Sequence, residues 1–208
     1  MSIIDYYFWI NSDWAYLGAD RLEAIAARCN ATIRYKPVDL LDVYTRTGGI
    51  PLGQRAPERR AYREAELKRW MRRLDMPLNI TPRYMCPNGD LASRFTIAAD
   101  QLGLNVAALY KAILEAEWCK EQDISDAKVL LAVAATLDLP GDRIMQGALT
   151  DEVNALYRQY TDEAVAHGVF GSPTYVFNGE LFWGQDRLEF LEVAVAAAPS
   201  PVRSLCQS

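Results

Sequence analysis

Short apolar runs occupy both ends of the chain, and helical periodicity fills the part between them. Residues 3–10 form an apolar, aromatic-rich run that predicts a buried strand. Asn11 and Ser12 follow as good helix N-cap residues, and apolar residues then recur at helical spacing until residues 31–35 predict a second strand. A strand, a helix and a strand in this order form a βαβ unit, so we expect the two strands to be parallel.

The middle of the chain, from residue 39 to residue 167, carries mainly helical patterns. Residues 45–57 are rich in glycine and proline and are interpreted as a loop. The helices that we expect after this loop cover residues 59–74, 90–102, 106–117, 125–137, 142–148 and 151–166.

The last two strands predicted by the sequence form a hairpin. Residues 174–177 and 180–183 are apolar runs joined by an Asn-Gly dipeptide, which favours the positive φ values of a type I′ turn. Asp186 and Glu189 have the spacing of a capping box, which predicts the start of a final helix. The whole order predicts an α/β thioredoxin-like fold (βαβ plus ββα) interrupted by a large all-helical insertion.

We therefore divide the chain of 208 residues into three parts. Residues 1–38 plus 168–198 form the predicted thioredoxin-like domain, and residues 39–167 form the inserted helical domain. Residues 199–208 form a C-terminal tail that we expect to be loose.

Composition limits the classes of partner and compartment. The net charge of -5 argues against nucleic acid as the main partner. No apolar run reaches the ~18 residues of a membrane helix, and the start of the chain lacks the features of a signal peptide. The four cysteines lie far apart, which indicates free thiols and a cytoplasmic protein. The spacing of the cysteines and the single histidine predicts no metal site.

The hairpin is preceded by Ser172-Pro173. In a thioredoxin-like fold this position lies beside the start of the first helix, and the proline there is expected to be cis. The alternative is an ordinary trans proline at the start of an edge strand, which is the commoner form of the bond. With a cis bond, the backbone of Ser172 could pair with an extended thiol peptide as an added strand would.

Ser12 stands at the other half of this predicted site. A thiol-disulfide enzyme would carry a C-x-x-C motif at this strand-to-helix junction, but Ser12 and Ala15 occupy the two cysteine positions. An exposed hydroxyl at a helix N-terminus can instead donate a hydrogen bond to a bound thiolate and lower the pKa of that thiol. The alternative is a plain N-cap role.

A third group of residues opens the last predicted helix. The free N–H groups of Gly184, Gln185 and Asp186 suit a carboxylate, and the Asp186 side chain suits an ammonium group. A simple helix cap is compatible with both. Together with Ser12 and Ser172 these residues describe a site for a peptide that has a thiol and an α-amino acid head. Glutathione fits that description.

Two motifs carry a family resemblance. IIDYYFWINSDWAYLG near the N-terminus and GVFGSPTYVFNGELFWGQDRLEFLE near the C-terminus resemble those of the 2-hydroxychromene-2-carboxylate isomerases. These are DsbA-like thioredoxin-fold proteins related to the kappa-class glutathione transferases, and residues 2–197 follow the family's order. The resemblance implies a glutathione-dependent isomerase in aromatic hydrocarbon catabolism, often dimeric, that opens the ring of its substrate to a trans-benzylidenepyruvate-type product.

The resemblance also implies residue roles. Ser12 would be the catalytic residue that contacts and activates the glutathione sulfur. The remaining glutathione-binding residues would be Ser172, Trp183, Gly184, Gln185 and Asp186. The residues implied for a small aromatic carboxylate substrate are Tyr44, Gln54, Arg55 and Tyr84. Arg55 would supply the cation for the carboxylate.

The sequence departs from the family pattern at three positions. Asp13 replaces a proline, and a carboxylate there opposes thiolate formation unless it points into solvent or pairs with a cation. Ser172 replaces a valine-like residue, and Tyr44 stands where some members carry lysine, which leaves the exact substrate open.

Two other functions stay open at this point. One is a kappa-like glutathione transferase or peroxidase, which would share the glutathione half of the site. The other is a non-catalytic thioredoxin-fold protein that binds peptides through the cis-proline surface.

Overall fold

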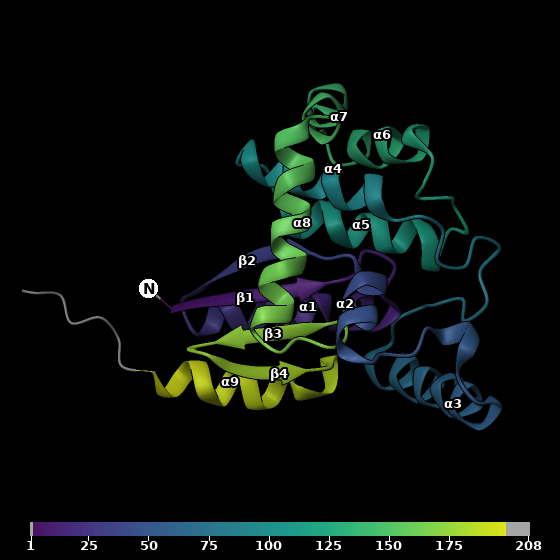
Figure 1. Ribbon diagram of the computed structural model, residues 1–208, viewed down its shortest axis with the longest axis vertical. Helices are drawn as coiled ribbons and strands as arrows, with labels where there is room; N and C mark the ends of the chain where they lie inside the picture. The colour runs from purple at the N-terminus through teal and green to yellow at the C-terminus, as the bar shows by residue number, and fades with distance from the viewer. Residues whose placement is uncertain (1, 199–208) are drawn as a thin grey trace, which may run out of the picture.

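Strands from both ends of the chain meet in one sheet. The computed structural model describes residues 2–198, in which a four-stranded sheet has the order β2-β1-β3-β4 (Figure 1). The strands are β1 (Ser2–Phe8), β2 (Ala31–Pro37), β3 (Thr174–Phe177) and β4 (Glu180–Trp183). β1 and β2 are parallel, whereas β3 is antiparallel to both β1 and β4. The predicted thioredoxin-like arrangement is confirmed.

Helices cover the sheet and form a separate group beside it (Figure 1). α1 (Asp13–Arg28) joins β1 to β2, and α9 (Leu188–Ala197) follows the hairpin. The helices between β2 and β3 are α2 (Leu40–Thr47), α3 (Pro57–Leu74), α4 (Asp90–Gln101), α5 (Val106–Trp118), α6 (Ala127–Ala135), α7 (Gly141–Ala148) and α8 (Asp151–Ala166). Six of these were predicted, with ends that differ by no more than two residues.

The alternation of side chains along β1 explains how the helices attach. Tyr6 and Phe8 point into the main core, where the Tyr6 ring stacks on Tyr175 at 5.1 Å and meets Tyr110 of α5 at 5.9 Å. Tyr7 points to the opposite face and packs in a smaller cluster with residues of α2 and α8. The main core therefore continues from the sheet into the inserted helices.

Helix α2 was not predicted from the sequence. Asp39 caps this helix, because its carboxylate accepts hydrogen bonds from the backbone of Leu41 at 2.9 Å and Asp42 at 3.2 Å. Gly48 ends the helix in a left-handed conformation at a φ of 78°. An Asp N-cap and a Gly C-cap were the available signals. The predicted loop at residues 45–57 begins inside this helix and is wrong to that extent.

The start of the last helix also differs from the prediction. A short 3₁₀ helix, η2 (Gln185–Arg187), precedes α9, whose N-cap is Arg187 without a side-chain capping hydrogen bond. The predicted capping box of Asp186 and Glu189 is therefore wrong. Gly184 has a φ of 97° and donates its backbone N–H to Pro173 O at 2.9 Å, so the chain turns tightly before the helix can begin.

Three local predictions are confirmed. Asn178 and Gly179 have φ values of 50° and 82°, as a type I′ turn requires. The bond between Ser172 and Pro173 is cis. The cysteines at positions 29, 86 and 119 are free thiols. Cys206 and the predicted tail at residues 199–208 lie outside the described residues.

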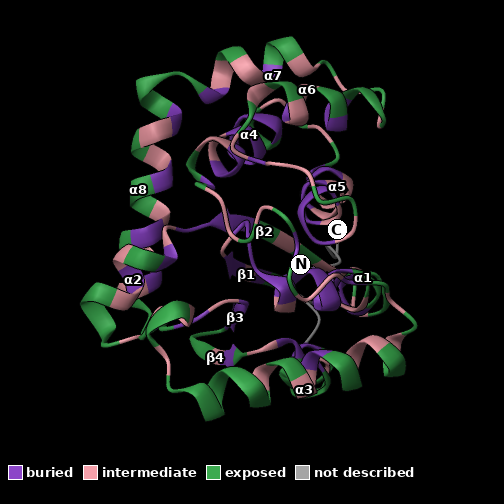
Figure 2. Ribbon diagram, turned by 90° about the vertical axis from the view of Figure 1, so that its right-hand side faces the viewer, coloured by how far each residue is buried: buried purple, intermediate pink, exposed green. Residues whose placement is uncertain are grey.

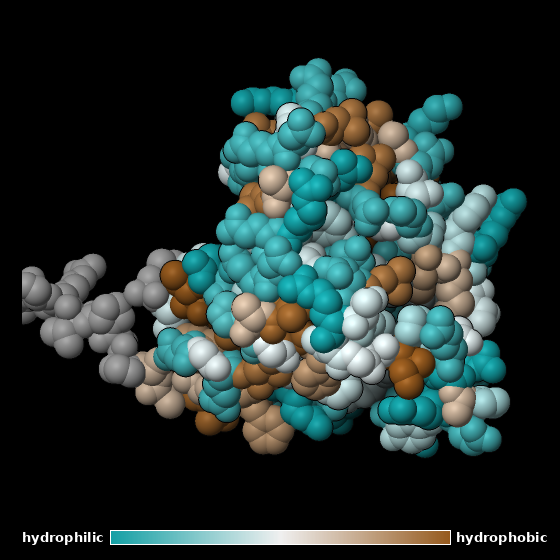
Figure 3. All heavy atoms as spheres, viewed as in Figure 1, coloured by the Kyte–Doolittle hydropathy of each residue, from teal (hydrophilic) through white to brown (hydrophobic). Residues whose placement is uncertain are grey.

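The described surface is consistent with these packing roles. Hydrophilic side chains cover most of α8 on the face that Figure 1 presents, while the opposite side of α8 packs on α2, α4 and β2 (Figure 3). Within residues 2–198, none of the helices combines the length and apolarity that crossing a bilayer requires.

Candidate functional site

Ser12 lies at the turn between β1 and α1 and is the N-cap of α1. Its Oγ accepts a hydrogen bond from the Ala15 backbone at 3.2 Å, and its own backbone N–H donates to Trp9 O at 3.0 Å. The residue is only 5% exposed, so the expectation of an exposed hydroxyl is wrong. The hydroxyl nevertheless borders a cavity. Since Oγ acts as acceptor toward the helix, its hydrogen remains available to donate to a group in that cavity.

Ser172 is held next to this turn. Its Oγ accepts a hydrogen bond from the Trp9 backbone at 2.8 Å, which ties the cis-proline turn to the end of β1. Within residues 2–198, no hydrogen bond uses the main chain of Ser172. An extended peptide could therefore pair with this backbone without displacing an existing bond.

The first cavity has a volume of about 580 Å³ and reaches Ser12. Its walls come from the β1–α1 turn, from α2, α3 and α5, and from residues 80–86. Its buried lining residues are Asn11, Ser12, Asp13, Leu40 and Trp118. A cavity of this size with fixed polar groups at its base suits a small aromatic molecule.

Asp13 and Arg63 form an ion pair at the wall of the first cavity. Arg63 comes from α3 and contacts the Asp13 carboxylate directly, and both side chains are largely buried. The second Asp13 oxygen accepts from the Trp14 backbone at 2.8 Å. Burial raises the pKa of the Asp13 carboxyl above its ordinary value, while Arg63 opposes that shift and favours the charged form. The carboxylate beside Ser12 is therefore paired with a cation, as a thiolate site at this turn requires.

A second cavity of about 590 Å³ adjoins the first. It lies between α3 and the turn after β4. The residues that line it near β4 are Trp183, Gly184, Gln185, Asp186 and Arg187, and those on α3 include Glu58, Arg59, Tyr62, Glu66 and Trp70. Both cavities are lined by Trp14, Arg55, Arg63 and Ser172. The two spaces therefore meet at the cis-proline turn.

Helix α3 forms the wall that both cavities share. Leu67 is the one buried residue of this helix, and most of its length is exposed (Figure 2). Its contacts with α1 include the ion pair between Arg63 and Asp13. α3 therefore covers the site while it is held to the rest of the molecule by few buried side chains.

The turn after β4 contains both fixed and exposed groups. Gln185 is buried, and Arg21 donates to its backbone oxygen at 2.9 Å and also to its side-chain oxygen. Trp183 is 50% exposed and lies against Phe170 with a ring distance of 4.8 Å. The Asp186 carboxylate contacts Arg187 at 2.7 Å on the surface. The structure thus brings the four predicted residues 183–186 together along the second cavity.

Tyr44 and Arg55 both border the first cavity, as predicted for a substrate pocket. Arg55 Nη2 donates to the Tyr44 hydroxyl at 3.1 Å, and its Nε donates to Ile50 O at 2.8 Å. The ring of Tyr44 lies over Gly49, where an added Cβ would come within 2.0 Å of it. Arg55 also borders the second cavity, so its position alone does not assign it to one ligand.

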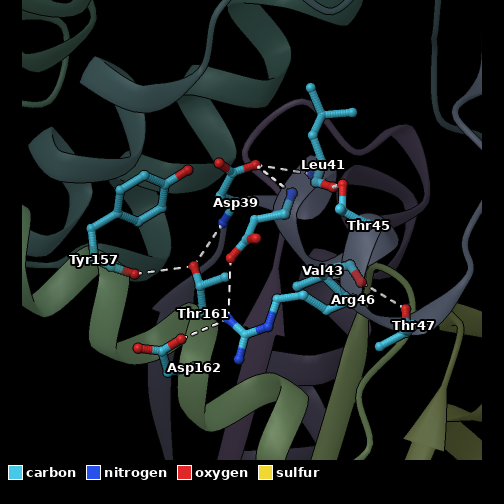
Figure 4. Close-up of polar contacts among 10 residues, drawn as sticks. Asp39, Leu41, Val43, Thr45, Arg46, Thr47, Tyr157, Thr161 and Asp162 are labelled. Atoms are coloured by element: carbon cyan, nitrogen blue, oxygen red, sulfur yellow. Dashed lines mark hydrogen bonds and ion pairs between the residues drawn. The ribbon is translucent and has the colours of Figure 1, made fainter.

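Helix α2 owes its position to α8 (Figure 4). The backbone of Asp39 donates to Thr161 Oγ1 at 3.0 Å. Arg46 bridges Asp162 of α8 at 2.6 Å and Asp42 of its own helix at 3.1 Å. These contacts fix the side of α2 that faces away from the first cavity, and so they orient Tyr44 toward it.

Two predicted residues lie outside the cavities. Gln54 is exposed and borders neither of them, although its neighbour Arg55 borders both. Tyr84 packs beneath the Arg83 guanidinium at 5.3 Å, while Met85 and Cys86 supply the lining at this segment. The geometry therefore gives no support to a substrate-binding role for Gln54 or Tyr84.

Sequence reasoning missed several lining residues. Arg60 and Arg63 lie on a helix whose basic residues are typical of a solvated face, and Trp118 has the pattern of an ordinary core aromatic. Cys86 borders the first cavity, where burial, helped by Glu117, raises the pKa of its thiol to about 12. It therefore stays a neutral thiol near pH 7. Asp13, a carboxylate next to Ser12 in the sequence, was the one sequence feature that indicated a nearby cation.

The described residues contain no group of three or more His, Cys, Asp or Glu side chains placed to hold a metal ion.

Comparisons with known proteins agree with the fold. A family model described as "DSBA-like thioredoxin domain" matches residues 3–196. A 2-hydroxychromene-2-carboxylate isomerase of Sphingobium xenophagum is 28% identical over 190 residues, covering 91% of this chain and 95% of that protein. One of Pseudomonas putida is 29% identical over 200 residues, covering 93% and 94%.

Solved structures give the same picture of the fold. A structure of 2-hydroxychromene-2-carboxylate isomerase superimposes with a TM-score of 0.80 at 27% identity, covering 92% of this chain and 93% of the other. A cytosolic disulfide reductase of Pseudomonas aeruginosa superimposes with a TM-score of 0.67 at 19% identity, covering 94% and 100%. The second likeness concerns the fold alone.

Proposed function

The chain belongs to the DsbA-like thioredoxin domain family, and from this premise we propose that it is a glutathione-dependent isomerase. Its proposed substrate is a 2-hydroxychromene-2-carboxylate-type intermediate of aromatic catabolism, which it converts to a trans-benzylidenepyruvate-type product. The observation that carries the proposal is the meeting of two cavities at Ser172, with Ser12 on one of them and residues 183–186 on the other. The isomerase names of the relatives support the reaction class.

The site needs a sulfur nucleophile from outside the chain. Ser12 and Ala15 stand where a disulfide exchange enzyme would carry its cysteines, so this turn cannot form a redox couple. Cys86, the cysteine that borders the first cavity, keeps its proton near pH 7 because its pKa is about 12. A thiol cofactor is consistent with both facts.

The residues present fit glutathione. The predicted free N–H of Gly184 is wrong, because it donates to Pro173 O at 2.9 Å. The second cavity still offers the backbone N–H groups of Gln185 and Asp186 for the γ-glutamyl end, and the free main chain of Ser172 can pair with the cysteinyl part. A peptide bound in this way would place its sulfur at the junction of the cavities, near the Ser12 hydroxyl. When bound there, glutathione would supply a sulfur that adds to a conjugated carbon of the substrate and is released again after bond rotation.

The chain's own groups prepare this chemistry. The Ser12 hydroxyl would donate a hydrogen bond to the sulfur, and the N-terminal end of α1 would favour negative charge there. Arg63 neutralises Asp13, which would otherwise oppose a second negative charge nearby. Buried walls such as Trp118 exclude water from the reacting groups.

The substrate side of the site is the part of the first cavity between α2 and α3. Tyr44 offers an aromatic surface, and Arg55 and Arg60 offer cations to a carboxylate. The free thiols at positions 29, 86 and 119 support our further proposal that the protein works in the reducing cytoplasm.

The proposal is tested with purified protein and 2-hydroxychromene-2-carboxylate. The ultraviolet absorbance of the substrate should convert to that of the ring-opened product, and the rate should depend on added glutathione, which should not be consumed. Conversion at the same rate after removal of all thiols contradicts the glutathione dependence. A stable conjugate with a chlorinated aromatic would instead indicate a transferase. Failure to bind glutathione at millimolar concentration would indicate a non-catalytic binding protein.

A further inference from the structure

A carboxyl group with no role in the proposed reaction is buried beneath the first cavity. α5 places Glu117 and Trp118 there as consecutive residues, and both are 0% exposed. The Glu117 Oε1 atom accepts a hydrogen bond from the Cys86 backbone at 2.9 Å. The Oε2 atom is buried without a hydrogen-bond partner.

Asn11, which precedes Ser12, also has a buried side-chain oxygen without a hydrogen-bond partner. Its Nδ2 donates to Pro87 O at 2.9 Å, whereas its Oδ1 is buried without a partner. The Asn11 side chain acts on the Glu117 carboxyl as a donor that favours the charged form, but burial has the larger effect. A buried carboxylate oxygen that lacks a donor is costly, since its charge is not compensated. One proton on the carboxyl removes that charge.

The charges around Glu117 lead to the same conclusion. The ionisable groups that face it are Asp13 of α1, Asp123 after α5 and the Cys86 thiol, none of which is a cation. Arg63, which faces Asp13 and Cys86, is committed to Asp13. Within residues 2–198, no ion pair includes Glu117. A deprotonated Glu117 would therefore be a second buried carboxylate beside Asp13, with no cation to compensate its charge.

We propose that Glu117 is a positioning residue that works as a neutral carboxylic acid beneath the Ser12 turn and holds Cys86 in the cavity wall. Its Oε1 atom holds the wall through the Cys86 backbone. Loss of the proton adds an uncompensated negative charge beneath the place where a thiolate is proposed to bind. The consequence for the thiolate rests on the proposed function, whereas the protonation of Glu117 does not.

The pH range of this effect follows from burial. Burial raises the pKa of Glu117 to about 8, with Asp13 and Asp123 adding to the shift, while hydrogen bonds from Cys86 and Asn11 lower it. Because the native protein holds this proton more tightly than the unfolded chain, the contribution to stability is complete in acid. It is lost as pH rises from the ordinary carboxyl range to about 8.

The test replaces the acid by its neutral isostere, Glu117→Gln, with Glu115→Gln on the same helix as the matched control for a partly exposed carboxylate. The melting temperature of the wild type and of the control should fall by ~5 °C or more between about pH 5 and 8. The melting temperature of Glu117→Gln should lack this fall. A Glu117→Gln variant with the same pH dependence as the wild type overturns the proposal.

Two further readouts separate positioning from simple packing. In the wild type, kcat/KM should fall above about pH 8 by ~tenfold per pH unit, and the ultraviolet absorbance of bound glutathione thiolate should fall with it. In Glu117→Gln both should persist at alkaline pH, with activity near pH 7 within ~threefold of the wild type. A folded Glu117→Gln variant that has lost most activity at pH 7 shows that the charged form is needed and overturns the proposal.

The wild type alone also tests the neutral acid. Its infrared spectrum in heavy water should show a protonated carboxyl band at neutral pH that disappears around pH 8. The absence of that band overturns the proposal even if the variant does not fold. If the wild type does not bind glutathione, the proposed function fails, while the melting and infrared results still decide the protonation of Glu117.

Discussion

The two cavities differ in how firmly their walls are held. The first cavity has buried side chains at its base, including Ser12, Asp13 and Trp118. Around the second cavity, Gln185 is the buried lining residue and the others are exposed or only partly buried. Fixed groups suit chemistry, since their orientation costs nothing at the moment of reaction, whereas exposed groups suit the recognition of a flexible peptide.

The comparison suggests that chemistry and cofactor recognition are separated at Ser172. Helix α3 belongs to both regions, because its residue Arg63 and the preceding Arg55 border each of them. Variants of residues that border one cavity or both therefore test this division.

Replacement of Arg63 by Ala should have the largest effect. The change leaves the Asp13 carboxylate buried without its cation, which typically costs about 3–5 kcal/mol, so the free energy of unfolding should fall by that amount. Urea unfolding followed by circular dichroism measures it.

The double variant Asp13→Asn/Arg63→Met provides the control. Removal of both charges should restore most of the lost stability, because no buried charge remains unpaired. A loss of less than ~1 kcal/mol in Arg63→Ala would show that the pair behaves as a surface ion pair, and the first cavity would lose its rigid character.

Ser12→Ala should reduce catalysis much more than stability. As an N-cap whose Oγ accepts one hydrogen bond, Ser12 contributes ~1 kcal/mol to folding. The rate with glutathione should fall by more than ~tenfold near pH 7 and recover in part at higher pH, where the thiol ionises without help. Steady-state kinetics over a pH series measure this, and full activity of the variant would remove Ser12 from the mechanism.

Gly184→Ala should affect the second cavity alone. Gly184 has a φ of 97°, which strains any other residue, and an added Cβ would come within 2.4 Å of Asp186 Oδ1, so the Asp186 carboxylate must move. We expect the dissociation constant for glutathione to rise by ~tenfold with little change in substrate KM. Isothermal titration calorimetry measures the first quantity.

Gly179→Ala is the matched control for that variant. Gly179 has a similar φ of 82°, but an added Cβ would meet nothing within 4 Å. Its backbone strain should therefore lower stability without changing glutathione affinity. Equal losses of affinity in the two variants would contradict the assignment of residue 184 to the cofactor.

The neighbouring residues Arg59 and Arg60 offer the smallest and most selective test. Arg60 borders the first cavity and Arg59 the second, although both are exposed on the same helix. Arg60→Ala should raise KM for the carboxylated substrate by ~threefold, and Arg59→Ala should weaken glutathione binding by a similar factor. The same pattern for both variants would mean that the cavities are not separate in function.

The sequence predicted the sheet side of the site better than the helical side. Apolar runs and the Asn-Gly turn depend on neighbours in the chain, and the thioredoxin-like fold that they predict placed Ser12 and the cis proline after Ser172. Arg63 and Glu117 could not be placed in this way, because their roles depend on Asp13 and Cys86, which lie far away in sequence. Helical periodicity identified their helices but could not show which face meets the site.

The placement of substrate residues shows the same limit. Arg55 and Tyr44 border the first cavity as predicted, whereas Gln54 and Tyr84 do not, although each is next to a lining residue. In an irregular segment, one position along the chain can reverse the direction of a side chain. Resemblance at the level of a motif therefore identifies the segment more securely than the residue.

A crystal structure of the protein with glutathione tests the central claim most directly. The account predicts that the γ-glutamyl end lies in the second cavity beside Gly184 and Gln185, that the cysteinyl backbone pairs with Ser172, and that the sulfur enters the first cavity within hydrogen-bonding distance of Ser12 Oγ. A tripeptide that lies wholly within one cavity, or whose sulfur points away from Ser12, would contradict it.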